Sequence, residues 1–219
     1  MTRVAVIDYG AGNMVSIVHA LTAAGASVTV ARRGRDLAEA DGVVVPGVGA
    51  SGPAMARLRR AGFDEAIPRV VEEGATYLGV CLGMQLLFER SEEDGALGFG
   101  LMRGEVRALP AAPSLPHIGW NELEPVRPTH PLLHGIADHD ACYFVHSYAP
   151  VPEDDAIVLA WTEHGGRFAS IVAQGHLLGV QFHPERSGEV GLRLLRNFVA
   201  LAARGSAVGA PDAAAAVAR

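Results

Sequence analysis

The chain has 219 residues, 49 % of them hydrophobic, and a formal net charge of −6 at neutral pH. This length and apolar content suffice for one α/β domain with a substantial core. The acidic balance argues against nucleic acid or an anionic membrane as a partner, and no apolar run approaches the roughly 18 residues of a membrane-spanning helix. Two cysteines cannot build a disulfide framework and the N-terminus carries no secretory pattern, so a cytoplasmic protein is expected.

The N-terminal part alternates short β-branched runs with longer segments of helical spacing, which is typical of βα units in a parallel sheet. Strands are predicted over Val4–Ile7, Ser27–Ala31, Gly42–Val45 and Thr76–Val80. Helices are predicted over Met14–Ala24, Ala54–Arg60, Asp64–Glu73 and Leu82–Arg90. The sequence therefore predicts an α/β domain with a mostly parallel sheet.

The pattern changes between Leu101 and Phe182 to strands and Pro-rich turns, of which "PAAPSLP" and "VRPTHP" are the clearest loops. This texture predicts a mixed or antiparallel extension of the sheet. A last helix is predicted over Glu189–Ala203. We expect the domain to span residues 1–204, followed by a disordered low-complexity tail over residues 205–219.

The segment "GVCLGMQ" places Cys81 between Gly79 and Gly83, at the predicted change from strand to helix. Such a sharp turn exposes a nucleophile, because glycine neighbours let the backbone pass close by. The start of the helix favours the thiolate, and the N–H of Leu82 is free to donate to an oxyanion. The alternative is a buried structural cysteine, so a partner base must decide.

Among nine histidines, His183 has distinctive surroundings, since it ends the apolar run Leu177–Phe182 and is followed by Pro184 and Glu185. Glu185 could accept a proton from one ring nitrogen, which leaves the other nitrogen to take the thiol proton of Cys81. No C-x-x-C pair or second clustered histidine completes a zinc site, so no metal is expected. The pattern predicts a Cys81, His183 and Glu185 triad.

The loop "PGVGASG" has glycines in the G-x-G-x-x-G order of dinucleotide-binding proteins. It follows the third predicted strand instead of the first, Pro53 precedes the helix, and the acidic Glu72 falls inside a helix. We therefore expect no dinucleotide and no other cofactor. Cys142, in "CYFVHSY", has no flanking glycine or adjacent base and is predicted to be structural.

The motifs "GVCLGMQLLFE" and "GVQFHPE" resemble the nucleophile and His/Glu motifs of class I glutamine amidotransferases. Within that class, "VAVIDYGAGNMVSI", "VVVPGVGA", "HIGWNEL" and "YFVHSY" resemble the glutaminase subunits of imidazole glycerol phosphate synthase. The motifs follow the family order from Arg3 to Phe198. The resemblance implies the single-domain class I fold, with a central, mostly parallel sheet flanked by helices and a mixed extension.

The resemblance also implies a reaction. Cys81 would attack the side-chain amide of glutamine, releasing ammonia and leaving a thioester that water hydrolyses to glutamate. The ammonia would pass to a (β/α)8 cyclase subunit in a heterodimer. There it would react with a phosphoribulosyl aminoimidazole-carboxamide nucleotide, giving imidazole glycerol phosphate and an aminoimidazole nucleotide for histidine biosynthesis.

Further residues receive roles only through this resemblance. The second oxyanion donor would be the N–H of Val48 or Gly49, in a peptide that flips easily, and we hypothesise that the oxyanion hole is incomplete until the partner and its nucleotide bind. The residues implied to bind glutamine are Gln85, Glu93, Ser147 and Tyr148. Those implied to lie at the partner interface near the ammonia exit are Trp120, Asn121 and Arg186.

Other functions remain open at this point. Class I glutaminases of anthranilate, GMP, carbamoyl phosphate or pyridoxal phosphate synthesis share the triad, although "YGAGN", "PGVG" and "GWNEL" favour the histidine pathway. A cysteine peptidase would explain the nucleophile turn and a base, but not Gln85 or the His-Pro-Glu run. A degenerate binding module would be expected to lose a triad residue, and all three are present.

Overall fold

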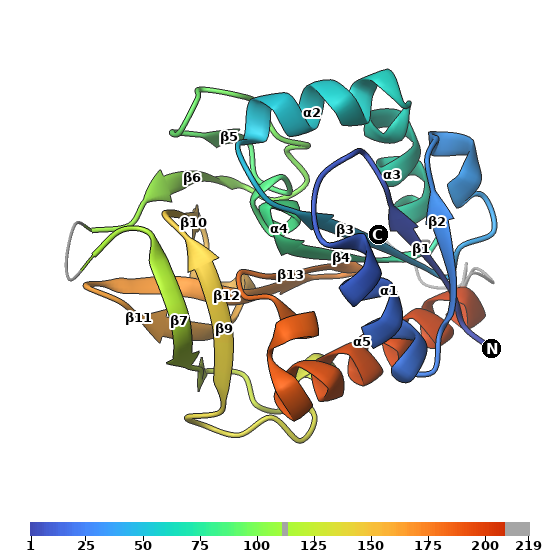
Figure 1. Ribbon diagram of the computed structural model, residues 1–219. Helices are drawn as coiled ribbons and strands as arrows, with labels where there is room; N and C mark the ends of the chain where they lie inside the picture. The colour runs from blue at the N-terminus through green and yellow to red at the C-terminus, as the bar shows by residue number, and fades with distance from the viewer. Residues whose placement is uncertain (111–113, 209–219) are drawn as a thin grey trace, which may run out of the picture.

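An eight-stranded sheet forms the centre of the computed structural model, which describes residues 1–110 and 114–208 (Figure 1). Its strands, in spatial order, are β2 (Ser27–Ala31), β1 (Arg3–Ile7), β3 (Gly42–Gly47), β4 (Thr76–Cys81), β13 (Leu177–Val180), β12 (Arg167–Gln174), β11 (Val158–Glu163) and β8 (Glu124–Pro125). The pairs from β2 to β13 are parallel, and those from β13 to β8 are antiparallel. The predicted mostly parallel sheet with an antiparallel extension is confirmed.

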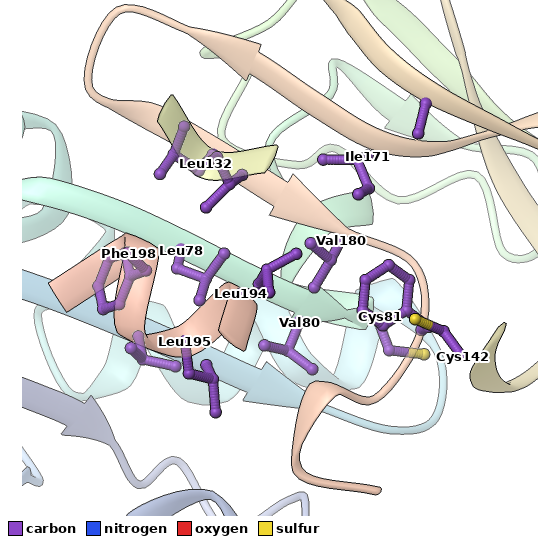
Figure 2. Packing of buried hydrophobic residues seen from close by; sticks show 14 of the residues in the cluster. Leu78, Val80, Cys81, Leu132, Cys142, Ile171, Val180, Leu194, Leu195 and Phe198 are labelled. Atoms are coloured by element: carbon purple, nitrogen blue, oxygen red, sulfur yellow. The ribbon is translucent and has the colours of Figure 1, made fainter. Parts of the chain in front are cut away.

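Helices cover both faces of the parallel part, which explains why its inner strands β3 and β4 are buried along their whole length, whereas the edge strand β2 is largely exposed. On one face, α1 (Met14–Ala23) and α5 (Gly188–Val208) pack against each other, and on the other α2 (Ser51–Arg60) packs against α3 (Phe63–Glu72) (Figure 1). Alternate residues of β1 accordingly belong to two different hydrophobic clusters. Figure 2 shows the first cluster, in which Cys81 lies among buried side chains of the sheet and of α5.

Two smaller sheets flank the central one. One has three strands, in the order β10 (Tyr148–Pro152), β6 (Gly104–Ala108) and β5 (Arg90–Ser91), and the other pairs β7 (His117–Glu122) with β9 (Ala141–His146). Short helical turns complete the described part: α4 (Leu82–Gln85), η1 (Gly34–Leu37), η2 (Pro131–Leu133), η3 (Asp155–Ile157) and η4 (Pro184–Arg186). β9 and β10 follow one another directly and lead the chain past the end of β4 (Figure 1).

The prediction of a helix over Leu82–Arg90 is wrong beyond Gln85. Leu86, Leu87 and Phe88 are consecutive and all fully buried, which a helix with one apolar face cannot achieve. Their carbonyls instead accept hydrogen bonds from a later loop, from the N–H groups of Phe99, Met102 and Gly100 respectively. Tertiary burial therefore overrides the helical spacing of this segment.

Some predicted ends also move. β3 runs two residues past the predicted end to Gly47, and α2 begins at Ser51, because Pro53 is tolerated in a first helical turn, where its missing N–H is not needed. α5 continues past Ala203 to Val208, so the predicted tail begins inside this helix. Residues 209–219, and 111–113 of the predicted loop "PAAPSLP", lie outside the described residues. Within the described ranges, no helix has the length and hydropathy needed to cross a membrane.

Candidate active site

Cys81 occupies a strained turn between β4 and α4. Its backbone has φ 53° and ψ −108°, in the half of dihedral space that side chains with a Cβ rarely adopt. Leu82 is the first helical residue after it, and its N–H has no acceptor within the helix. The fold thus presents the side chain of Cys81 and a backbone donor without a helical acceptor at the same point.

The glycines around Cys81 are needed for close backbone contacts. A Cβ on Gly79 would lie 2.3 Å from the carbonyl oxygen of Gly83, and a Cβ on Gly83 would lie 1.8 Å from the carbonyl oxygen of Val45 in β3. Tyr77 also stabilises this turn, because its hydroxyl donates to the carbonyl of Gly83 at 2.7 Å. The spacing of these glycines therefore reflects packing of the turn against β3 and β4.

His183 and Glu185 form a buried pair at the end of the run that follows β13. Nδ1 of His183 is 3.0 Å from Oε1 of Glu185, and the two side chains are 7 % and 5 % exposed. Nε2 of His183 is buried and has no hydrogen-bond partner among residues 1–110 and 114–208, so this nitrogen is available for proton transfer. Burial lowers the pKa of His183, but the interactions with Cys81 and Glu185 outweigh burial and raise that pKa to about 10. The imidazolium form is therefore favoured beside Cys81.

Replacing Glu185 by glutamine should lower the pKa of His183 by at least about one unit, because glutamine keeps a hydrogen-bond acceptor but removes the negative charge. Titration of the His183 ring signals by NMR measures this change. Glu189→Gln is the matched control, since Glu189 is an exposed carboxylate in the first turn of α5. An unchanged His183 pKa in Glu185→Gln would mean that Glu185 does not hold the ring in its charged form.

A cavity of 280 Å³ opens in front of Cys81 and gathers residues from segments far apart in the sequence. It is lined by Val48, Gly49, Cys81, Leu82, Gln85, Glu93, Pro116, Val145, His146, Ser147 and Tyr148. All of the residues predicted to bind glutamine or to form the oxyanion hole thus surround one space. Burial and the neighbouring Asp94 raise the pKa of Glu93, the one carboxylate that lines it. The roles of these residues stay predictions.

The loop after β3 approaches the nucleophile because β3 extends to Gly47, two residues beyond its predicted end. Gly47 pairs with Cys81 in the register of β3 and β4, so Val48 and Gly49 follow directly at the mouth of the cavity. Gly49 has φ +94°, a conformation that favours glycine, while Val48 is 49 % exposed. Tyr9 packs against Gly47, and a Cβ at position 47 would lie only 2.3 Å from the Tyr9 hydroxyl.

Sequence reasoning missed two buried polar residues at this site. Nδ1 of His146 is 2.9 Å from the carbonyl oxygen of Tyr148, and its Nε2 is 3.1 Å from Nδ1 of His117. The side-chain amide of Gln181 donates to Sγ of Cys81 at 3.5 Å. One signal could have found Gln181, because it precedes His183 by two positions in an extended run, and alternate residues of such a run share a face.

The residues predicted at the partner interface divide into two groups. Trp120 is 58 % exposed and meets Tyr143 edge-on, and the guanidinium of Arg186 lies 4.0 Å from the centre of the Tyr143 ring. Trp120 and Arg186 are exposed and Tyr143 is half-buried between them, so the three residues form an aromatic and cationic surface. Asn121 instead turns inward, where its Nδ2 donates to the carbonyl of Glu163 at 2.9 Å and lies 3.2 Å from Nε2 of His117.

Comparison with known proteins identifies the family of this chain. Residues 5–202 match the family described as Glutamine amidotransferase class-I. The chain is 47 % identical over 205 residues to "Imidazole glycerol phosphate synthase subunit HisH" of Synechococcus sp. (strain JA-3-3Ab), which covers 92 % of this chain and 95 % of that protein. It is 46 % identical over 198 residues to the protein of the same name in Aquifex aeolicus (strain VF5), covering 90 % of this chain and 95 % of that protein.

A solved structure supports the fold independently of close sequence similarity. "Structure of PurLQS from Thermotoga maritima" contains a chain that superposes with a TM-score of 0.73 at 19 % identity, covering 91 % of this chain and 98 % of that chain. At this identity the likeness concerns the fold alone. The family match and the two relatives go further: the chain belongs to the class I glutamine amidotransferases and, within them, to the family of imidazole glycerol phosphate synthase glutaminase subunits.

Proposed function

We propose that Cys81, His183 and Glu185 carry out the glutaminase reaction of this family. The observation that supports it best is the placement of a strained, cavity-lining Cys81 beside the buried His183–Glu185 pair. Sγ of Cys81 attacks the carboxamide carbon of glutamine, and the C–N bond breaks to release ammonia and leave a glutamyl thioester. Water then attacks the same carbon, the C–S bond breaks, and glutamate leaves.

His183 moves the protons in both halves of this reaction. Its Nε2 accepts the proton of Cys81 and passes it to the leaving ammonia, then takes a proton from the attacking water and returns it to the sulfur. Glu185 fixes the tautomer and orientation of the ring through Nδ1 and stabilises its positive charge. The raised pKa of His183 supports this assignment, since a charged imidazole is the acid that the leaving group needs.

The negative charge that develops on the substrate oxygen requires backbone donors. The N–H of Leu82, at the start of α4, supplies one, and the N–H of Val48 or Gly49 supplies the second. Exposure of Val48 and the positive φ of Gly49 favour a loop whose peptide plane can turn. We infer that the partner and its nucleotide complete this oxyanion hole.

Glutamine is recognised through its amino-acid end. Both amide hydrogens of Gln85 are engaged within the protein, one with the carbonyl of Tyr148 and one with Gln181, so its Oε1 is left to accept from the substrate's ammonium group. Glu93 adds a carboxylate to the same cavity, which is also lined by Ser147, between β9 and β10, and by Tyr148, the first residue of β10.

The partner in this proposal is the (β/α)8 cyclase subunit, which uses the ammonia to make imidazole glycerol phosphate and the aminoimidazole nucleotide from its phosphoribulosyl substrate. The relatives are named as subunits of the synthase, which supports an assembly with a second chain. Trp120, Tyr143 and Arg186 present the surface for it, since aromatic residues and arginine are enriched in the centres of protein interfaces. We place this complex in the cytoplasm.

Glutaminase turnover by the isolated chain is expected to be low, and to rise roughly 10-fold or more when the cyclase and its nucleotide substrate are both present. Glutamate formation, measured with each component added in turn, tests this. The cyclase without nucleotide is the control for simple association. Full turnover by the isolated chain would contradict the incomplete oxyanion hole, and no turnover under any condition would contradict the glutaminase assignment.

A further inference from the structure

Gln181 is a buried polar residue that takes no part in the proton transfers of the proposed reaction. It follows β13, is fully buried, and its backbone N–H donates to the carbonyl of Ser170 at 2.9 Å, which anchors the residue to β12. Its side chain lies between two groups of the site, with Oε1 3.2 Å from Nε2 of Gln85 and Nε2 3.5 Å from Sγ of Cys81. A fully buried amide in contact with the nucleophile calls for a chemical explanation.

The orientation of this amide follows from its neighbours. The carbonyl oxygen of Tyr148 can only accept, so the Gln85 atom 2.8 Å from it must be the NH₂ group. The second hydrogen of that NH₂ group points to Gln181, and the atom that receives it must be an oxygen. The NH₂ group of Gln181 is therefore the end that faces Cys81.

His146 donates to the same carbonyl of Tyr148 that sets the direction of these hydrogen bonds. Its Nδ1 is 2.9 Å from the same carbonyl oxygen of Tyr148 and so must carry a hydrogen. Its Nε2 then accepts from Nδ1 of His117, whose Nε2 accepts from Asn121. Burial lowers the pKa of His146 to about 3 and that of His117 to about 4, which agrees with two neutral rings. Each hydrogen bond from Asn121 to Tyr148 thus has one allowed direction.

We propose that Gln181 is a catalytic residue that stabilises the thiolate of Cys81 by donating a side-chain N–H to the sulfur. The proposal rests on the glutaminase function proposed above, because it assigns Gln181 a part in activating that nucleophile. The neutral thiol has its own partner, the carbonyl oxygen of Val145 at 3.9 Å from Sγ. Each protonation state of the sulfur therefore has one group that suits it, and a donor held in a buried site requires no reorganisation when charge forms.

Other groups that titrate also face this sulfur. His183 immediately precedes η4 and interacts electrostatically with Cys81, and Glu185 within η4 pairs with His183. Tyr9, two residues after β1, is buried and responds to the charge of Cys81. His146 from β9 and Glu93 line the cavity in front of Cys81. The amide of Gln181 does not titrate, so its N–H is available whenever the thiolate forms.

The test is the pH dependence of Cys81 alkylation by iodoacetamide, followed by mass spectrometry of the peptide that contains it. Gln181→Met conserves volume without a donor, and Gln181→Glu places a carboxylate beside the sulfur. We expect the midpoint of alkylation to rise by about one pH unit in Gln181→Met and further in Gln181→Glu. In glutaminase assays kcat should fall roughly 10-fold in both variants, with KM little changed in Gln181→Glu, which keeps an oxygen acceptor for Gln85. Gln174→Glu, on the exposed end of β12, should behave as the unsubstituted chain.

A second measurement needs no substitution at Gln181. In the unsubstituted chain the side-chain NH₂ signal of Gln181 should shift with pH at the same midpoint as alkylation, and this shift should disappear in Cys81→Ala. An unchanged alkylation midpoint in a folded Gln181→Met chain, or an NH₂ signal that ignores the ionisation of Cys81, would overturn the proposal. If the alkylation midpoint rises in Gln181→Met as expected but the unsubstituted chain has no glutaminase activity, only the proposed function is contradicted.

Discussion

Replacing Cys81 by alanine is expected to abolish glutamine hydrolysis, with a loss of roughly 10⁴-fold or more, because no other group can form the thioester. Glutamate release by the chain together with the cyclase and nucleotide measures this loss. Synthesis of imidazole glycerol phosphate from added ammonia should remain, since alanine changes only the glutaminase site. Loss of the ammonia-dependent reaction as well would contradict the separation of the two roles.

A glycine variant at the same position tests the strain in the nucleophile turn. At an ordinary position glycine is less stable than alanine by roughly 0.5–1 kcal/mol. At φ 53° and ψ −108° the Cβ of alanine keeps the strain, whereas glycine relieves it. Cys81→Gly should therefore unfold at the same or a higher denaturant concentration than Cys81→Ala. A clearly less stable glycine variant would mean that Cys81 carries no backbone strain.

Replacing Gly83 by alanine is expected to lower the free energy of unfolding by about 3 kcal/mol or more, because the new methyl group has no room. Its Cβ would lie 1.8 Å from the carbonyl oxygen and 2.9 Å from the carbonyl carbon of Val45. Both atoms belong to the backbone of β3, so α4 must move away from the sheet. Because Cys81 immediately precedes α4, glutaminase activity should fall in the same variant.

Urea unfolding, with activity assayed on the folded fraction, measures both effects. Gly95→Ala is the matched control: nothing lies within 4 Å of its Cβ and only its positive φ of 69° opposes the substitution. That control should lose about 1 kcal/mol and keep its activity. Equal losses in the two variants would show that the close approach of α4 to β3 does not stabilise the site.

Cys81→Gly and Gly83→Ala both test how the fold holds the nucleophile in its strained conformation. β3, β4 and α4 meet so closely that only glycine fits at Gly79 and Gly83, and this packing holds Cys81 in a conformation that it would not adopt alone. Strain of this kind persists only where the surrounding structure over-determines it. The free energy that offsets this strain comes from the buried hydrophobic clusters on both faces of the sheet. Cys81 itself belongs to one of these clusters (Figure 2).

Local patterns predicted much of this architecture. The β-branched runs, helical spacings and glycine punctuation located the parallel strands and the helices that cover them, because each such strand is apolar on both faces. The same logic failed at Leu86, Leu87 and Phe88, where a run that fits a helix is buried on all sides by a loop further along the chain. Local sequence patterns cannot predict that residues further along the chain will bury a segment on all sides.

The amino-acid sequence by itself determined the candidate triad, since Cys81 between two glycines and His183 beside Glu185 are short-range patterns whose chemistry follows from residue type and spacing. Only the tertiary structure decided which buried polar groups touch these residues. Gln181, which follows β13, contacts the sulfur at the end of β4 and is oriented by hydrogen bonds through Gln85 in α4 and Tyr148 in β10. Hydrogen bonding depends on distance and direction in space, and segments about a hundred residues apart acquire these only when the sheet has formed.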